Sequence, residues 1–173
     1  MTQTVVQVRV DEHRSLLAFL REQGQVSMAN DVENDFKKVL VVSAASFFEK
    51  RIVDALHAFA SKAHDSRMAE IMVSTAFKRE KYSSMFQWTA NNVNSFLALF
   101  GREFKASVSE EIGKDPQLMT GMRAFLQLGE HRNRLVHNDF ADLTVGDKTV
   151  DEVFAAYVEA DHFVDHLCTR LRA

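Results

Sequence analysis

The sequence has one cysteine (Cys168), one proline (Pro116) and six glycines among its 173 residues. A single cysteine excludes an internal disulfide and is typical of a reducing compartment. The scarcity of proline and glycine argues against a loop-rich or many-stranded fold and favours helices. Apolar residues make up 46% of the chain, which is enough to bury a core in a single domain of this length.

The sequence also lacks long apolar runs and an excess of basic residues. No stretch approaches 18 uninterrupted apolar residues, so no membrane span is predicted. The first residues have neither the basic nor the apolar segment of a signal peptide, so we expect a cytoplasmic protein. The net charge of -3 argues against a general nucleic-acid coat, but it allows a small basic site that recognises RNA.

Apolar residues recur at helical spacing along most of the chain, which predicts one all-α domain over residues 1–173, a bundle of five to six helices. Residues 1–10 are predicted as a flexible arm, in preference to a short strand. A first helix is expected over 11–23, with Leu16, Leu17, Phe19 and Leu20 facing inward and Gly24 ending it. The second helix, over 30–62, is predicted to be the longest.

Three further helical segments are expected, over 66–79, 92–112 and from Pro116 onward. The charged run 78–81 is interpreted as a solvated junction, with a phosphate contact as the alternative. The aromatic stretch 82–88 is predicted to pack in the core, because stacking on bases also needs a basic surround. Residues 140–148 are predicted as a loop, and a capping box of Thr149 and Glu152 opens the last helix.

The polar cluster at residues 130–139 is the most unusual stretch of the chain. Asn133 and His137 are i,i+4 neighbours on a helix, and the long side chain of Arg132 can swing back toward His137. A cation, an amide and an imidazole can therefore converge on one point. Leu135 and Val136 are expected to anchor the opposite side of this turn in the core.

These residue types match the needs of RNA cleavage without a metal. Imidazole suits proton transfer near neutral pH, so His137 is the candidate acid or base. The guanidinium of Arg132 can hold a phosphate through two parallel hydrogen bonds, and Asn133 can orient the ring or the phosphate. One subunit offers one well-placed imidazole, which leads us to expect a two-fold homodimer in which two copies share a site.

The hexamer Arg132-Asn133-Arg134-Leu135-Val136-His137 resembles the R-N-x-x-x-H signature of the HEPN superfamily. The layout, with a long second helix containing Glu49 and the motif before a capped last helix, is similar to the RiboL-PSP-HEPN type. The resemblance implies an α-helical bundle that dimerises around a shared cleft and acts as a metal-independent endoribonuclease with no cofactor. Arg132 and His137 map onto the catalytic pair, and Asn133 maps onto the polar residue after the arginine.

Members of that superfamily often act as toxins, phage-defence effectors or RNA-processing modules, so a separate antitoxin or activator is an expected partner beside the RNA substrate. Supporting or RNA-binding roles are predicted for six further residues, Glu49, Glu130, His131, Arg134, Asn138 and Asp139. For Glu49 the competing interpretation is a surface carboxylate paired with Lys50 or Arg51.

Other interpretations remain open at this point. The cluster could be an ordinary polar helix end, with its arginines paired to Glu130 and Asp139. His162 and His166, spaced i,i+4, could hold a divalent metal, but no third ligand is evident and we predict no metal site. The alternative functions are a non-catalytic HEPN-like module that binds RNA, nucleotide or protein, and a helical interaction protein unrelated to nucleic acid.

Overall fold

The computed structural model describes residues 3–62, 84–137 and 148–173. Regular structure in these ranges is entirely helical, with six α-helices and one 3₁₀ turn, which confirms the all-α prediction. The elements are α1 (Val5–Glu22), α2 (Val26–Lys62), α5 (Asn94–Leu97), η1 (Ala98–Phe100), α6 (Arg102–Lys114), α7 (Pro116–His137) and α8 (Val150–Arg172). None of these helices is both long and apolar enough to cross a membrane. The expected helix 66–79, the run 78–81 and all of the predicted loop 140–148 except Lys148 lie outside the described residues.

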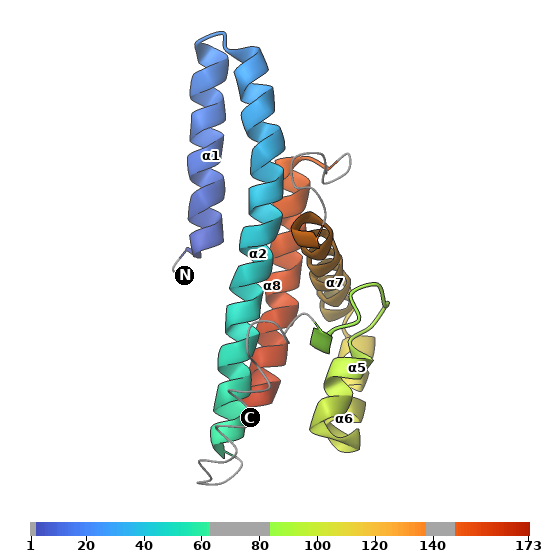
Figure 1. Ribbon diagram of the computed structural model, residues 1–173. Coiled ribbons are helices and arrows are strands. Elements are labelled where there is room, and N and C mark those ends of the chain that lie inside the picture. Colours follow the sequence, from blue (N-terminus) through green and yellow to red (C-terminus); the bar gives the residue numbers. More distant parts are fainter. Residues whose placement is uncertain (1–2, 63–83, 138–147) are drawn as a thin grey trace.

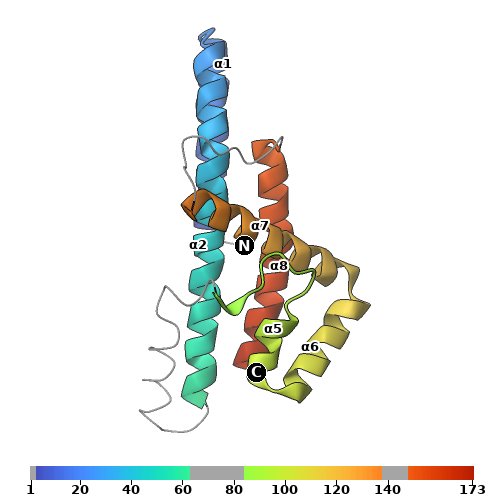
Figure 2. The same ribbon diagram turned by 45° about the vertical axis from the view of Figure 1, so that its right-hand side comes forward.

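The long helix α2 and the last helix α8 lie side by side, and α7 crosses over both of them (Figures 1 and 2). Helix α1 packs on the N-terminal half of α2, and this hairpin extends beyond the rest of the bundle (Figure 1). The largest fully buried side chains come from α1, α2, α5, α7 and α8 and form one continuous core. Its aromatic members include Phe48, Phe96, Phe125, Tyr157 and Phe163.

Helix α1 begins at Val5, so the prediction of a flexible arm before residue 11 is wrong. The cause is a capping box formed by Thr4 and Gln7. The Thr4 hydroxyl accepts from the Gln7 backbone N–H at 3.2 Å, and the Gln7 side chain accepts from the Thr4 N–H at 2.7 Å. Val6 and Val10, one helical turn apart, are then buried on the side facing the bundle. Val6 and Val10 therefore belong to the apolar face of a helix and not to an alternating, strand-like pattern.

Two other boundaries differ from the prediction. Helix α2 begins at Val26, about one turn earlier than expected. The predicted run 92–112 is broken at Gly101, whose φ of 96° is accessible mainly to glycine and separates η1 from α6. The predicted stop at Gly24, with φ of 70°, is confirmed, as is the capping box that opens α8 at Thr149.

Three apolar side chains that were expected to face the core are exposed. They are Leu16 (45%), Phe19 (57%) and Val136 (51%). Helical spacing shows which side of a helix is apolar, but the number of neighbouring helices decides how much of that side is covered. Helix α1 has α2 as its main neighbour, so only a narrow row of its residues is buried.

The buried residue His13 joins α1 to α2. Its ring is 5% exposed and stacks on Phe36 with 3.8 Å between ring centroids, and its Nε2 has no hydrogen-bond partner among the described residues. Burial lowers the pKa of His13 below its usual value; Glu33 acts in the opposite direction, and Arg21 lowers the pKa further. The folded protein therefore keeps this ring neutral at a pH where the unfolded chain binds a proton.

We expect the free energy of unfolding to be largest above pH 6.5 and to fall as the pH drops below that value, because only the unfolded chain gains the proton on His13. His13→Phe retains the stack on Phe36 and should flatten this dependence. Urea titrations at pH 7.5 and 5.5 measure it, with the exposed His57→Gln as the matched control. Equal pH dependence in wild type and His13→Phe would show that His13 contributes nothing to it.

Candidate active site at the end of helix α7

The last two turns of α7 carry the polar cluster, from Glu130 to His137. Leu128 and Leu135 are buried and fix this part of the helix on the core. The expectation that Val136 also anchors the turn is wrong, because its side chain is half exposed. At this end of α7, therefore, only the side that carries Leu128 and Leu135 is packed on the core, and the polar residues face outward.

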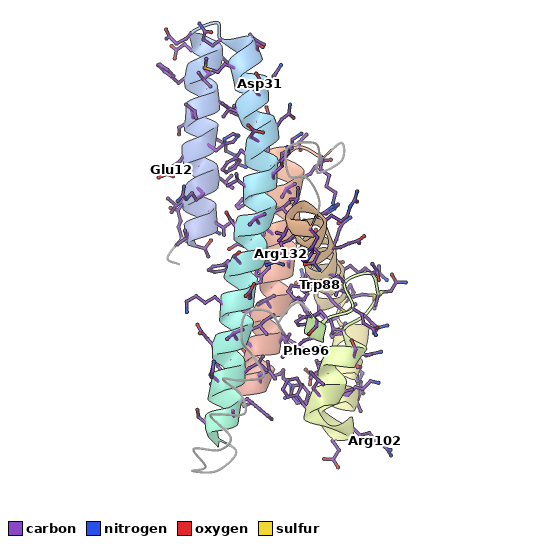
Figure 3. The ribbon with its side chains drawn as sticks, viewed as in Figure 1. Glu12, Asp31, Trp88, Phe96, Arg102 and Arg132 are labelled. Carbon is purple, nitrogen blue, oxygen red and sulfur yellow. The ribbon has the colours of Figure 1, made fainter. Side chains whose placement is uncertain are left out.

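Arg132 and Asn133 hold each other in place. The Arg132 Nη1 donates to the Asn133 Oδ1 at 3.2 Å, and both side chains are partly buried. They lie beside a small hollow between α7, α2 and the segment before α5, which we call the α7 hollow (Figure 3 shows Arg132 and Trp88 beside α2). Its lining is Ala45, Phe48, Glu49, Trp88, Phe125, Leu128, Gly129, Arg132 and Asn133. The free space is about 10 Å³, close to that of one water molecule, so a phosphate can bind only at its mouth.

Glu49 reaches the same hollow from α2, which brings together residues more than eighty positions apart in the sequence. The competing interpretation, a carboxylate paired with its basic neighbours, is wrong. Lys50 pairs with Asp54 at 2.7 Å, and the Arg51 Nη2 donates to Asp165 of α8 at 2.7 Å. Within the described residues Glu49 has no ion pair of its own, and it lines the hollow together with Arg132.

His131 points into a different environment. Its Nε2 is buried and has no hydrogen-bond partner in the described part of the chain. Burial and then the charge of Lys148 lower the pKa of His131, Glu130 opposes them, and Arg134 lowers it further. Lys148 itself donates to the Gln127 side chain at 2.9 Å. His131 is therefore a neutral, partly buried ring and not one of the groups that line the α7 hollow.

A longer groove runs along the outer side of α7, and we call it the α7 groove. At one end it is lined by Trp88, Thr89, Glu130, Asn133 and Arg134. It continues past Ala90, Asn91, Thr120, Arg123, Gln127 and, from α8, Glu159. Trp88 and Asn133 line both this groove and the α7 hollow, so the two concavities meet at these side chains.

Trp88 was predicted to be core, and it is only partly buried. Its ring packs near Phe86 and Phe125, with centroid distances of 5.1 and 5.4 Å. A Cβ on Gly129 would lie 2.0 Å from the indole, so only glycine lets the ring rest against α7 at this position. Stacking of a base on Trp88 would need basic residues nearby, and these come from α7, which lies far from residue 88 in the sequence. The sequence signal for this close packing is Gly129, a glycine that follows the apolar helical run of α7.

His137 is the last residue of α7 and is exposed; it lines neither the hollow nor the groove. Asn138 and Asp139 lie outside the described residues. The structure thus brings Arg132, Asn133 and Glu49 together, and joins Glu130 and Arg134 to them through the groove. It does not place His137 in the same concavity within one subunit.

The second histidine pair has a structural contact. His166 Nε2 lies 2.9 Å from Glu111 Oε2 of α6, and His162 is exposed. Across residues 3–62, 84–137 and 148–173 no three His, Cys, Asp or Glu side chains are grouped as metal ligands. His166 thus connects α6 to α8, and the prediction of no metal site stays a prediction.

The fold and the site together define a helical-bundle domain with an arginine–amide–histidine cluster before its last helix. The family model described as RiboL-PSP-HEPN matches residues 8–172. The chain belongs to this family, which confirms the resemblance seen in the sequence. No curated protein and no solved structure matches the chain. Membership indicates a ribonuclease or an RNA-binding module.

Proposed function

We propose that the protein is a metal-independent endoribonuclease whose catalytic residues are Arg132, Asn133 and His137. One observation carries the proposal: the Arg132–Asn133 pair is held at the mouth of a hollow, one and a half helical turns before an exposed imidazole. A fixed cation beside a proton-transfer group is the arrangement that phosphodiester transfer needs. The family to which the chain belongs supports the same function.

In the proposed reaction a base takes the proton of the 2′-OH, and the 2′-oxygen attacks the adjacent phosphorus. The bond from phosphorus to the 5′-oxygen breaks, and that oxygen receives a proton. The products are a 2′,3′-cyclic phosphate and a 5′-OH. Arg132 stabilises the negative charge that develops on the phosphorus centre, and its bond to Asn133 limits the orientations of the guanidinium. His137 transfers protons, and Glu49 limits the desolvation cost of the cation.

The proposed working unit is a homodimer that shares the site between its subunits. Two proton transfers need a base and an acid, whereas each subunit offers one exposed imidazole at this end of α7. Val136, half exposed beside His137, supplies apolar surface for a partner at the same place. Two-fold symmetry would place two copies of each group around one cleft.

Cleavage is expected to persist in excess chelator, because every proposed group is a side chain. The upstream fragment should carry a 2′,3′-cyclic phosphate or its hydrolysis product, and a DNA strand of the same sequence should stay intact for lack of a 2′-OH. Gel analysis of end-labelled strands, with mass spectrometry of the fragments, measures both. Activity that disappears on chelation and returns with zinc or manganese would contradict the mechanism and direct attention to His162 and His166.

A second function is favoured by one observation, namely that the α7 hollow has room for about one water molecule. The alternative is a non-catalytic HEPN-like module that binds RNA, nucleotide or a protein partner. RNA binding without turnover under all conditions would favour it. In either case, the proposed setting is a toxin, defence or RNA-processing system with a separate antitoxin or activator.

A further inference from the structure

We propose that the α7 groove is a binding subsite for one unpaired guanine base next to the scissile phosphate. The inference rests on the proposed function, since it names part of the substrate that the Arg132 site would cleave. Its basis is the continuity of the two concavities: Trp88 and Asn133 line both, so an RNA strand whose phosphate meets Arg132 has its neighbouring base at the groove.

Trp88 provides the aromatic surface. The ring is partly exposed, and it is fixed by contacts with Phe86, Phe125 and the backbone at Gly129. A ring held in this way loses little conformational entropy when a base packs against it. Unpaired RNA bases are commonly recognised by stacking on such side chains, and one stack is worth roughly a tenfold or greater change in affinity.

The charges around the groove fit a nucleotide better than an uncharged ligand. Arg132, Arg134 and Arg123 follow one another along α7, and Lys148 is tied to the groove residue Gln127. These four cations exceed the three nearby carboxylates, on a chain whose net charge is -3. A base bound in the groove would therefore have its sugar–phosphate backbone in a region of net positive charge.

Glu130 selects the base, because it is the carboxylate that lies with Trp88 and Asn133 in the groove. Glu130 lines both parts of the groove, and Glu159 reaches it from α8. An ionised carboxylate only accepts hydrogen bonds, and its two oxygens can accept from two adjacent donors at once. Guanine presents two adjacent donors, N1–H and the N2 amino group. Adenine, cytosine and uracil each place an acceptor beside their donor, which a carboxylate repels.

The test uses short single-stranded RNAs with one guanosine, adenosine, cytidine or uridine next to a fixed cleavage position. Matched strands with a 2′-deoxy sugar at the attacking nucleotide report binding alone. Wild type should prefer guanosine about tenfold or more in both assays. Glu130→Gln should lose this preference, so that the variant binds and cleaves the guanosine and uridine strands about equally.

Trp88→Phe should keep the fold and weaken binding of all strands by a few fold, whereas Trp88→Ala should weaken it roughly 10- to 100-fold. Glu12→Gln is the matched control, because Glu12 is exposed on α1, away from α7 (Figure 3). Glu130→Gln is the decisive variant, because Trp88→Ala also removes packing against Phe125.

The outcomes separate the subsite from the proposed function. If wild type cleaves RNA with equal efficiency beside every base, or if Glu130→Gln keeps the guanosine preference, the subsite is wrong and the ribonuclease stands. If no strand is cleaved but the deoxy strands show a guanosine preference that Glu130→Gln abolishes, the subsite stands and the ribonuclease is wrong. Absence of any base preference in binding would overturn the subsite in that case too.

Discussion

Replacing Arg132 or His137 with alanine is expected to reduce RNA cleavage by roughly 10²- to 10⁴-fold. In the proposed mechanism Arg132, which donates to Asn133, supplies a fixed positive charge where the phosphorus centre becomes more negative. His137 is the exposed imidazole that can exchange protons with the substrate. Both side chains contribute little to the core, so circular dichroism spectra and melting temperatures should stay close to those of wild type.

The matched controls are Arg102→Ala and His57→Ala, because both side chains are exposed and lie on other helices, α6 and α2. They should keep wild-type turnover. Asn133→Ala should lose about 10- to 100-fold, since Asn133 orients Arg132 and does not transfer protons in the proposed scheme. Wild-type turnover in either alanine variant at 132 or 137 would remove that residue from the mechanism.

Mixing the two inactive variants tests whether the site is shared. A heterodimer of Arg132→Ala and His137→Ala chains retains one arginine and one histidine, which can fall on the same composite site. Partial recovery of cleavage on mixing, proportional to the heterodimer fraction measured by native mass spectrometry, would support sharing. If the heterodimer forms and stays as inactive as each parent, one arginine and one histidine from different subunits do not make a working site. Either each subunit must supply both groups, or the whole site lies within one subunit.

Gly121→Ala should destabilise the bundle at the crossing of α7 and α8. A Cβ at this position would lie 2.4 Å from the backbone oxygen of Glu159 and 2.9 Å from the Cβ of Phe163. Backbone atoms cannot rotate away, so α7 and α8 would have to separate along their crossing. We expect a loss of about 1–3 kcal/mol in the free energy of unfolding, in the range of overpacked cores.

Gly113→Ala is the control, and it should change the free energy of unfolding in the opposite direction. Gly113 lies inside α6, and a Cβ there would meet nothing within 4 Å. Alanine should stabilise the helix by about 0.5–1 kcal/mol, because glycine loses more backbone entropy on folding. Urea titrations of both variants measure the pair. A Gly121→Ala protein as stable as wild type would show that the two helices can shift apart at little cost.

The fold could be predicted to a large extent because its signals are local. The capped start of α8 at Thr149 and the breaks at Gly24 and Pro116 depend on a few neighbouring residues. The same kind of signal was present at Thr4 and Gln7, where alternation of valines concealed it. Which apolar residues are covered could not be predicted, because this depends on how many helices surround each one.

The candidate site could be predicted only where it is continuous in the sequence. Residues 130–137 stood out as a cluster, and the structure places them at the end of one helix. The positions of Glu49 and Trp88 beside Arg132 depend on how α2 and the segment before α5 pack against α7. Trp88 carried no functional signal of its own, because its charged neighbours belong to another part of the chain.

The segment from Phe86 to Val93 forms one wall of the α7 groove and is held to the bundle at its two buried ends and by the packing of Trp88 on Phe125. Thr89 and Asn91, between these ends, are exposed and lie outside the helices. Substitutions there cost little stability, whereas Arg132 and Asn133 sit on a rigid helix. Under the proposed function, variation at these positions is expected to change which RNA is bound and to leave the cleavage chemistry intact, so they offer a starting point for directed evolution of new sequence preferences.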